Sequence, residues 1–406
     1  MSSSLPSADV DVTMSLEWCR NLPKAELHCH IGGCVRASTL EDLLPSATRA
    51  EARLALESTT LAGAFEIFKY VHAAICTEAA LARVVREALE DAAADGVEYI
   101  ELRSTPRLLN GAGDASARAL GIPLNIEQRD LPLHRYVAVV GAAIVDAAKA
   151  MPQLIARLLI SLDRSASEDM QASCARVATA WNCENIFGLA PFPNSTSRLV
   201  VGVDVSGDPR KGDIRTLLSL LDDLRNIGLK ISIHLGEIKG ADADAETAAV
   251  IKWKPDRIGH LAIVESLGLA ALSTLGIDAP PVEVCPTSNA LTLNLDTLYS
   301  HPTLGERISD TFTRIAICTD DPSIFKTSLS LEYLRVAHAF GLNCTDISKL
   351  SAASFDYAFA EPTIMAAVKS RAMDRIVVVG GEIECSKNTM DSSQNGATVL
   401  ELVVDL

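Results

Sequence analysis

Eight short apolar segments alternate with helical stretches over most of this chain, and this repeat constrains the fold more than any other feature. Most of the segments are nearly continuous in apolar residues, as expected for parallel strands that are buried on both faces. Stretches between them, such as 78–96 and 213–228, carry apolar residues at helical spacing and end at a glycine. The repeat predicts an α/β fold, a (β/α)8 TIM-type barrel. The predicted strands are 25–31, 97–105, 156–163, 199–206, 229–236, 257–263, 281–288 and 314–320.

The connection after the first predicted strand, from about residue 36 to 96, is much longer than the usual strand-to-helix loop. Its helical stretches predict a lid on the active-site end of the barrel. We expect three parts: an N-terminal extension at 1–20, the barrel domain at 21–365 and a C-terminal extension at 366–406. Within the last part, 375–385 and 397–406 look like strands, and we assign them no function.

Charge and cysteine usage narrow the partners and the compartment. The net charge is -16 and the pI about 5.0, which disfavours binding to nucleic acid or to an anionic membrane. The ten cysteines include no CxxC pair, and the N-terminus lacks the apolar core of a secretory signal. We therefore expect a cytoplasmic protein with reduced thiols. We also expect it to be a monomer whose partner is a small molecule.

Polar residues stand at the C-terminal ends of the predicted strands, where barrel enzymes place their active sites. They are His28, His30, His234, Glu237, His260, Asp320 and Asp321. Alternation along a strand sends His28 and His30 to the same face, into the barrel. Three imidazoles and one carboxylate suit a catalytic zinc, and iron or cobalt would also fit. The strand at 199–206 has no lysine to bridge two metals, which favours a single ion.

The remaining polar residues can carry proton chemistry, although each also has a structural explanation. Glu237 is three residues beyond His234 and could act as a general acid, or simply favour a helix N-terminus. His260 could orient or deprotonate a water, or be a hydrogen-bonded core histidine. One of the adjacent Asp320 and Asp321 can bind metal while the other faces the substrate. Gly207 permits a close backbone approach to a ligand, or is a plain turn residue.

The motifs LPKAELHCHIGG, HLGEIKG, RIGH, CPTSN and ICTDDP, from about Leu22 to Ala360, resemble the adenosine deaminase family of the amidohydrolase superfamily. The chain looks closest to the adenosine deaminase-like branch, which includes enzymes that convert N6-methyl-AMP to IMP and methylamine. This resemblance implies a hydrolase with one Zn2+ per chain. The implied ligands are His28, His30, His234 and Asp320.

The same resemblance implies roles around a purine ring. Glu237 would protonate N1 while hydroxide adds at C6, and His260 would steady that hydroxide, which Asp320 would help to orient. Asp321 would hydrogen-bond N7, and the backbone N–H of Gly207 would meet N3. Further candidate substrate-binding residues are His30, His72, Arg107 and Arg164.

Two positions depart from the family pattern. Gly32 stands where the family usually has Asp or Asn, which puts contact with a 5′-hydroxyl in doubt and leaves room for a phosphate. Leu261 replaces the usual glycine after His260. Arg103, Arg107 and Arg164 lie at or beyond strand ends and could bind a phosphate, or form salt bridges on the rim.

These observations predict hydrolytic deamination of a 6-aminopurine nucleoside or nucleotide, with N6-substituted AMP as the expected substrate. Adenosine deaminase is the main alternative, followed by adenine deaminase. A metal phosphoesterase is disfavoured because the chain has only eight histidines, and His134, His301 and His338 fall outside the predicted strand ends. A non-catalytic nucleoside-binding barrel is disfavoured because every expected catalytic position is filled.

Overall fold

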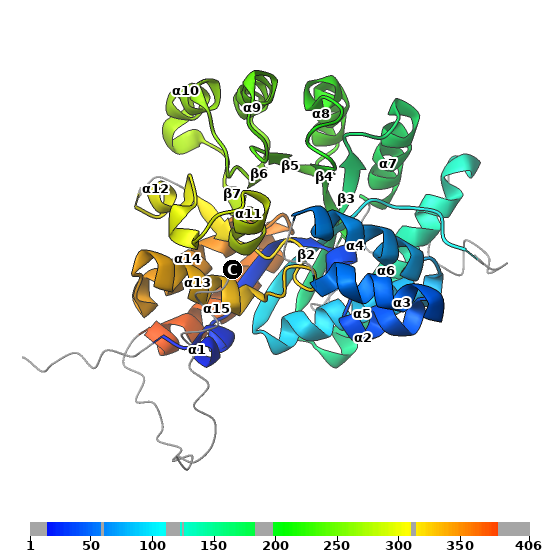
Figure 1. Ribbon diagram of the computed structural model, residues 1–406, viewed down its shortest axis with the longest axis horizontal. Coiled ribbons are helices and arrows are strands. Elements are labelled where there is room, and N and C mark those ends of the chain that lie inside the picture. Colours follow the sequence, from blue (N-terminus) through cyan, green and yellow to red (C-terminus); the bar gives the residue numbers. More distant parts are fainter. Residues whose placement is uncertain are drawn as a thin grey trace, which may run out of the picture.

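The computed structural model describes residues 14–57, 61–110, 122–123, 126–182, 198–309 and 314–380. Within these ranges, eight parallel strands form one sheet in the order β1 to β8, surrounded by helices (Figure 1). The predicted (β/α)8 barrel is confirmed. The strands are β1 Lys24–His30, β2 Val97–Ser104, β3 Ile155–Asp163, β4 Val200–Ser206, β5 Lys230–Leu235, β6 Arg257–His260, β7 Val282–Val284 and β8 Ile315–Ile317.

The barrel closes where the last strand meets the first. A parallel bridge pairs Cys29 with Asp320 just beyond the end of β8. Two backbone hydrogen bonds hold it: His30 N–H donates to the Asp320 carbonyl at 2.9 Å, and Asp320 N–H donates to the His28 carbonyl at 2.8 Å. Residues that are about 290 positions apart in the chain are thereby brought side by side, and this closing seam carries His28, His30, Asp320 and Asp321 of the predicted site.

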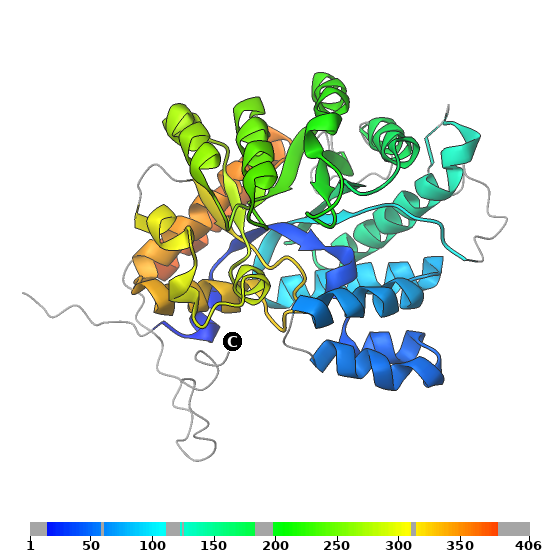
Figure 2. The same cartoon turned by 45° about the horizontal axis from the view of Figure 1, so that its top comes forward.

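Helices cover the outside of the barrel, as Figure 2 shows from a second side. The α9–α10 and α5–α6 pairs pack closely, and one apolar stretch, 128–150, is long enough to cross a membrane but is 67% buried inside the fold. The helices are α1 Leu16–Asn21, α2 Ala37–Leu43, α3 Ser46–Glu57, α4 Leu61–Ala74, α5 Glu78–Ala94, α6 Leu131–Ala150, α7 Glu168–Trp181, α8 Leu218–Asn226, α9 Ala241–Trp253, α10 Ser266–Leu275, α11 Pro286–Thr292, α12 Leu304–Ser309, α13 Leu329–Phe340, α14 Cys344–Ser354 and α15 Pro362–Gly380.

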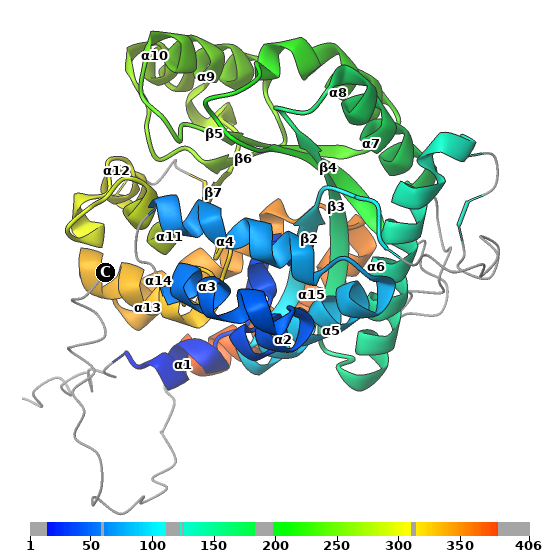
Figure 3. The same cartoon turned by 45° about the vertical axis from the view of Figure 1, so that its right-hand side comes forward.

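The long connection after β1 is helical. Helices α2, α3 and α4 pack on one another (Figure 3), and α4 also contacts the 3-10 turn Ile31–Cys34 that directly follows β1. Val71 of α4 lies next to Gly32 in that turn. The insertion therefore lies beside the seam, and its action as a lid stays a prediction.

The C-terminal part differs from the sequence expectation. Residues 375–380 were predicted as a strand, but they continue helix α15. Arg371 and Arg375 lie one helical turn apart, and both pair with Glu98 of β2, which favours the helical form. The predicted domain divisions after residues 20 and 365 fall within α1 and α15, and the division itself stays a prediction. The second predicted strand, 397–406, lies outside the described residues.

Candidate active site

Three imidazole nitrogens and one carboxylate oxygen converge at the seam. His28 Nε2 and His30 Nε2 each lie 3.3 Å from Asp320 Oδ1, and His30 Nε2 lies 3.2 Å from His234 Nε2. In a tetrahedral site with metal–ligand bonds of about 2.0–2.2 Å, ligand atoms are separated by about 3.3–3.5 Å. These atoms are thus spaced as the ligands of one ion. His28 is fully buried and its Nε2 makes no hydrogen bond, as expected of an atom whose partner is a metal.

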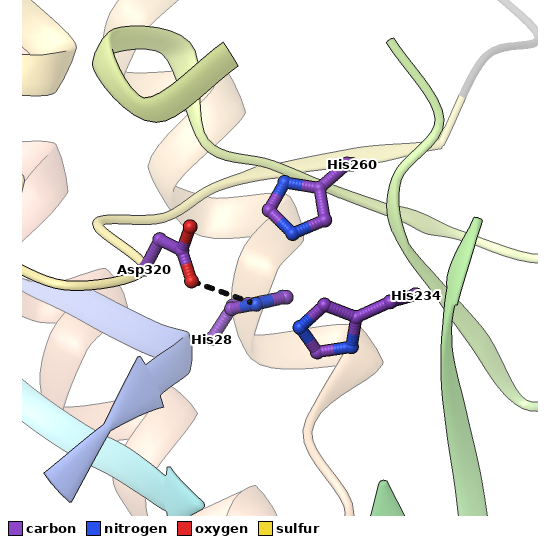
Figure 4. Close-up of side chains that lie close together, drawn as sticks. All are labelled: His28, His234, His260 and Asp320. Atoms are coloured by element: carbon purple, nitrogen blue, oxygen red, sulfur yellow. Dashed lines mark ion pairs between the residues drawn. The ribbon is translucent and has the colours of Figure 1, made fainter. Parts of the chain in front are cut away.

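His260 lies beside the group formed by His28, His30, His234 and Asp320, which we call the cluster. Figure 4 shows it above His28 and His234, and the ligand atoms of these three histidines and Asp320 all lie within 4.8 Å of one another. The Nε2 atom of His260 also lies 4.0 Å from Glu237 Oε1. His30 is a better candidate than His260 for the fourth metal ligand, because its Nε2 lies within 3.3 Å of both Asp320 Oδ1 and His234 Nε2. His260 faces the proton-transfer side of the site.

Buried carboxylates orient two of the histidines from behind. Glu283 Oε2 hydrogen-bonds His28 Nδ1 at 2.7 Å, and Asp204 Oδ1 lies 3.1 Å from His234 Nδ1 as a charged neighbour outside hydrogen-bond geometry. A carboxylate at Nδ1 holds the ring proton there and leaves the Nε2 lone pair for a metal. Although burial raises the pKa of Glu283, the positive charges of Arg103 and Arg257 hold that pKa well below its usual value. Glu283 therefore stays a hydrogen-bond acceptor.

Arg103 was expected to be a possible phosphate ligand, and the structure overturns this. Its side chain is fully buried below the converging histidines. Nη1 donates to Asp204 Oδ1 at 2.9 Å, and Nη2 donates to Glu283 Oε2 at 2.9 Å. Among the described residues, Arg103 is the arginine that pairs with Asp204, and it shares Glu283 with Arg257, so its charge is neutralised by buried carboxylates.

Two carboxyl groups at the site are poised to carry a proton. Burial raises the pKa of Glu237, and burial together with the charge of Asp320 raises the pKa of Asp321 to about 8. Asp321 Oδ1 is buried without a hydrogen-bond partner among the described residues. Gly33 permits this position, because a Cβ there would lie 2.0 Å from that oxygen. Asp321 can therefore act as a donor near neutral pH, and burial shifts Glu237 toward its protonated form.

The backbone at the site is strained. His260, Leu261 and Asp320 have φ values of 60°, 45° and 65°, in the left-handed region that favours glycine. Such conformations cost about 1–3 kcal/mol each and cluster at functional sites. Leu261 keeps this conformation without being glycine, with its side chain buried in the core. His260 is the last residue of β6 and Asp320 lies three residues beyond β8, and both side chains reach the group of converging histidines.

The remaining predicted substrate residues are more dispersed. Arg164 is committed to Glu246, with Nη2 donating to both carboxylate oxygens at 2.7 and 2.9 Å, which is the salt-bridge alternative. Arg107 Nη2 donates to the Ile75 carbonyl at 3.3 Å. His72 is exposed on α4. Among the described residues, neither Arg107 nor His72 has a hydrogen bond or ion pair with the cluster.

Gly207 follows β4 with φ of 113°, and a Cβ there would lie 2.4 Å from Asp163 Oδ1. The backbone conformation therefore favours glycine, and a larger residue would also have to displace the Asp163 carboxylate. The approach of its N–H to a purine stays a prediction.

Several residues at the site carried no role in the sequence interpretation. Ser288 Oγ donates to Asp320 Oδ2 at 2.7 Å, and the side chain of Asn289 lies 2.9 Å from His260 Nδ1. Both belong to the CPTSN motif, which begins α11 directly after β7. The sequence signal for Ser288 and Asn289 was a run of polar residues at the end of a predicted strand. Hydrophobic periodicity does not reveal which side chains such residues contact.

Comparison with known proteins agrees with this geometry. The family model described as "Adenosine deaminase" matches residues 23–376. The chain belongs to the adenosine deaminase family. As a family member it is an amidohydrolase-type deaminase. The family is metal-dependent, and the chain has a His/Asp group that could hold a metal ion.

The similar relatives and structures bear substrate-specific names. The N6-Methyl-AMP deaminase of Danio rerio is 30% identical over 359 residues, covering 85% of this chain and 92% of that protein. The Homo sapiens N6-Methyl-AMP deaminase is 28% identical over 361 residues, with 86% and 92% covered. The crystal structure of arabidopsis ADAL complexed with IMP superposes with a TM-score of 0.72 at 25% identity, covering 90% of this chain and 100% of that one.

Proposed function

We propose that this deaminase hydrolyses an N6-substituted AMP, with N6-methyl-AMP as the first candidate, to IMP and an amine, using one zinc ion. The observation that carries the chemistry is the approach of His28 Nε2 and His30 Nε2 to Asp320 Oδ1, both at 3.3 Å. The substrate is supported by relatives named N6-methyl-AMP deaminase and by a similar structure solved with IMP.

The residues that would hold the metal are His28, His30, His234 and Asp320. Their mixed nitrogen and oxygen set suits zinc, and iron or cobalt is the alternative that metal analysis would reveal. When bound, the metal supplies a hydroxide nucleophile at neutral pH by lowering the pKa of a water. One equivalent per chain is expected, and a second equivalent would contradict the proposal.

The protein's own groups manage the protons. Glu237, whose pKa burial raises, donates its proton to purine N1 as oxygen adds at C6. Asp321, protonated near neutral pH, donates a hydrogen bond to N7. The C6–N6 bond then breaks, and the amine leaves with the electron pair of that bond. The oxygen of water ends on C6, one of its hydrogens on N1 and the other on the amine, so the reaction balances.

The 5′-phosphate would be accommodated near Gly32. A Cβ at Gly32 would meet only Val71 Cγ1, at 3.6 Å, so this position is not crowded. Arg103 and Arg164 are occupied by carboxylates, which leaves Arg107 as the cation of the three without an acidic partner among the described residues. Its Nε is buried and makes no hydrogen bond in the described part of the chain. We infer that Arg107 is the phosphate-side cation.

The experiment compares kcat/KM for N6-methyl-AMP, AMP and adenosine with metal-loaded enzyme. N6-methyl-AMP should be preferred, followed by AMP. Adenosine deaminase proper is the alternative, and a clear preference for adenosine would establish it in place of the proposal. Arg107→Met should raise KM for the nucleotides and leave KM for adenosine unchanged, whereas equal effects on all three substrates would contradict the assignment of Arg107.

We also infer that the protein is a cytoplasmic monomer. All the converging side chains come from one chain, so no second copy is needed to complete the site. The eight cysteines in the described residues are free thiols, which suits a reducing compartment. Size-exclusion chromatography with light scattering and cell fractionation test the two statements. A stable dimer or a membrane-associated pool would contradict them.

A further inference from the structure

His301 lies outside the strand ends, yet it is connected to the site. Its Nδ1 accepts backbone N–H bonds from Leu304 at 3.1 Å and from Thr303 at 3.3 Å. An imidazole nitrogen that accepts an N–H carries a lone pair and no proton. Burial lowers the pKa of His301 to about 4, so the ring is neutral at pH 7. Its single proton must therefore be on Nε2, which is a donor.

The side-chain amide of Asn289 joins His301 to His260. One end lies 3.1 Å from His301 Nε2, and the other lies 2.9 Å from His260 Nδ1. All three residues are buried, with exposed fractions of 3–5%. The two ends of an amide have nearly the same shape, so their hydrogen-bond partners decide which is which. No water is needed to connect the three side chains.

The donor on His301 decides the orientation of the amide. In the structure Nδ2 of Asn289 faces His301 Nε2, which sets two N–H groups against each other. A half-turn of the amide exchanges its two ends and removes the conflict. Oδ1 of Asn289 then accepts from His301, and Nδ2 donates to His260 Nδ1. Because His260 Nδ1 must accept this bond, it carries a lone pair, and the ring proton of His260 is on Nε2.

We propose that His301 and Asn289 are positioning residues that fix the proton of His260 on Nε2, so that His260 donates a hydrogen bond to the attacking oxygen and is not a metal ligand. This rests on the proposed function for the identity of that oxygen. An Nε2–H has no lone pair for an ion or for deprotonating water. We call the hydrogen-bonded chain His301–Asn289–His260 the relay. It distinguishes the two histidines: His30 completes the metal site, and His260 steadies the nucleophile.

The isosteric variant Asn289→Asp separates the two tautomers. A carboxylate accepts and cannot donate, so His301 Nε2–H keeps its partner while His260 Nδ1 must now carry a proton. If the relay is correct, the variant moves the His260 proton from Nε2 to Nδ1, and nitrogen NMR of the variant verifies that Nε2 has lost its proton and that the ring has not become doubly protonated. The kcat should fall by about 10²- to 10³-fold, as on loss of one preorganised donor, with KM changed little. If His260 carries its proton on Nδ1 in the wild type, the variant keeps that tautomer and kcat stays within about threefold.

The direct readout is nitrogen NMR of the zinc-loaded protein labelled with 15N-histidine, with the His260 signals assigned through a His260→Gln variant. A protonated Nε2 and an unprotonated Nδ1 in the wild type support the relay, and the reverse pattern overturns it. This measurement does not use a substrate. A wrong substrate assignment would therefore leave the result intact, and a wrong tautomer would leave the substrate assignment intact.

His301 is tested with a matched pair. His301→Gln retains a side-chain N–H for Asn289 and should keep kcat within about tenfold of wild type. His301→Phe removes the donor and should reduce kcat by about 10²-fold. His338→Phe, at an exposed histidine near the end of α13, is the control and should leave kcat unchanged. Thermal unfolding is measured for each variant, and equal kcat values for the folded Gln and Phe variants would overturn the role of His301.

Discussion

Arg103 Nη1 lies 2.9 Å from Asp204 Oδ1, and both side chains are fully buried in the barrel. The same guanidinium reaches Glu283 through Nη2 at 2.9 Å. Asp204 lies behind His234 and Glu283 lies behind His28. One cation therefore connects the carboxylates that orient two of the proposed metal ligands, which ties the stability of the barrel core to the metal site.

Arg103→Met should weaken the fold and the metal site together. Removing one partner of buried ion pairs costs about 3–5 kcal/mol, and loss of groups that orient metal ligands typically costs about 10- to 100-fold in metal affinity. Urea unfolding and chelator competition measure the two effects. Arg107→Met is the control, because Arg107 pairs with no carboxylate in the described residues and should change neither quantity. If Arg103→Met raised only the KM for nucleotides and left stability and metal affinity unchanged, Arg103 would be a phosphate ligand after all.

Glu237→Gln should keep the metal and lose turnover. The amide cannot transfer a proton to N1, and general acid catalysis contributes about 10²- to 10⁴-fold. Elemental analysis and kcat measure the two properties. The contrasting variants His28→Ala and Asp320→Ala should lose metal and activity together. Near-normal turnover in Glu237→Gln would show that another group donates the proton.

The activity should fall as pH rises through about 8, the value to which burial and the charge of Asp320 raise the pKa of Asp321. Only the protonated carboxyl can donate to N7, so the active form is lost on the alkaline side. Asp321→Asn retains a donor that does not titrate, and its kcat/KM should lack this alkaline limb. An unchanged profile in the variant would assign the limb to another group, with Glu237 as the next candidate.

Gly33→Ala should abolish activity, whereas Gly32→Ala should be tolerated. A Cβ at Gly33 would lie 2.0 Å from Asp321 Oδ1 and 2.4 Å from Asp321 Cα, so the loop that carries Asp320 and Asp321 would have to move. The neighbouring Gly32 has only an ordinary contact, 3.6 Å from Val71 Cγ1. Measuring the metal content and kcat of the two folded variants tests this difference. Comparable activity in both would show that the loop can yield.

The sequence was sufficient for the barrel and for grouping the side chains at the C-terminal ends of its strands. Burial on both faces makes parallel strands recognisable, and strand ends in a barrel share one rim, so His28, His30, His234 and Asp320 could be grouped without coordinates. The inward turn of Arg103 could not be foreseen, because it depends on carboxylates from β4 and β7 that occupy the same layer. Nor could the position of His301, because the path of the chain between β7 and β8 has no periodicity.

Gly32→Asp should shift the specificity toward the unphosphorylated nucleoside. A carboxylate here would restore the acid that the family usually has, and it would add a negative charge near the proposed phosphate. Repulsion between charges a few ångströms apart in a partly buried site amounts to a few kcal/mol, so kcat/KM for N6-methyl-AMP should fall by at least about tenfold relative to adenosine. Gly32→Asn, of nearly the same size and uncharged, separates charge from volume. Equal losses in both variants would show that space, not charge, determines the preference, and no change in either would place the phosphate elsewhere.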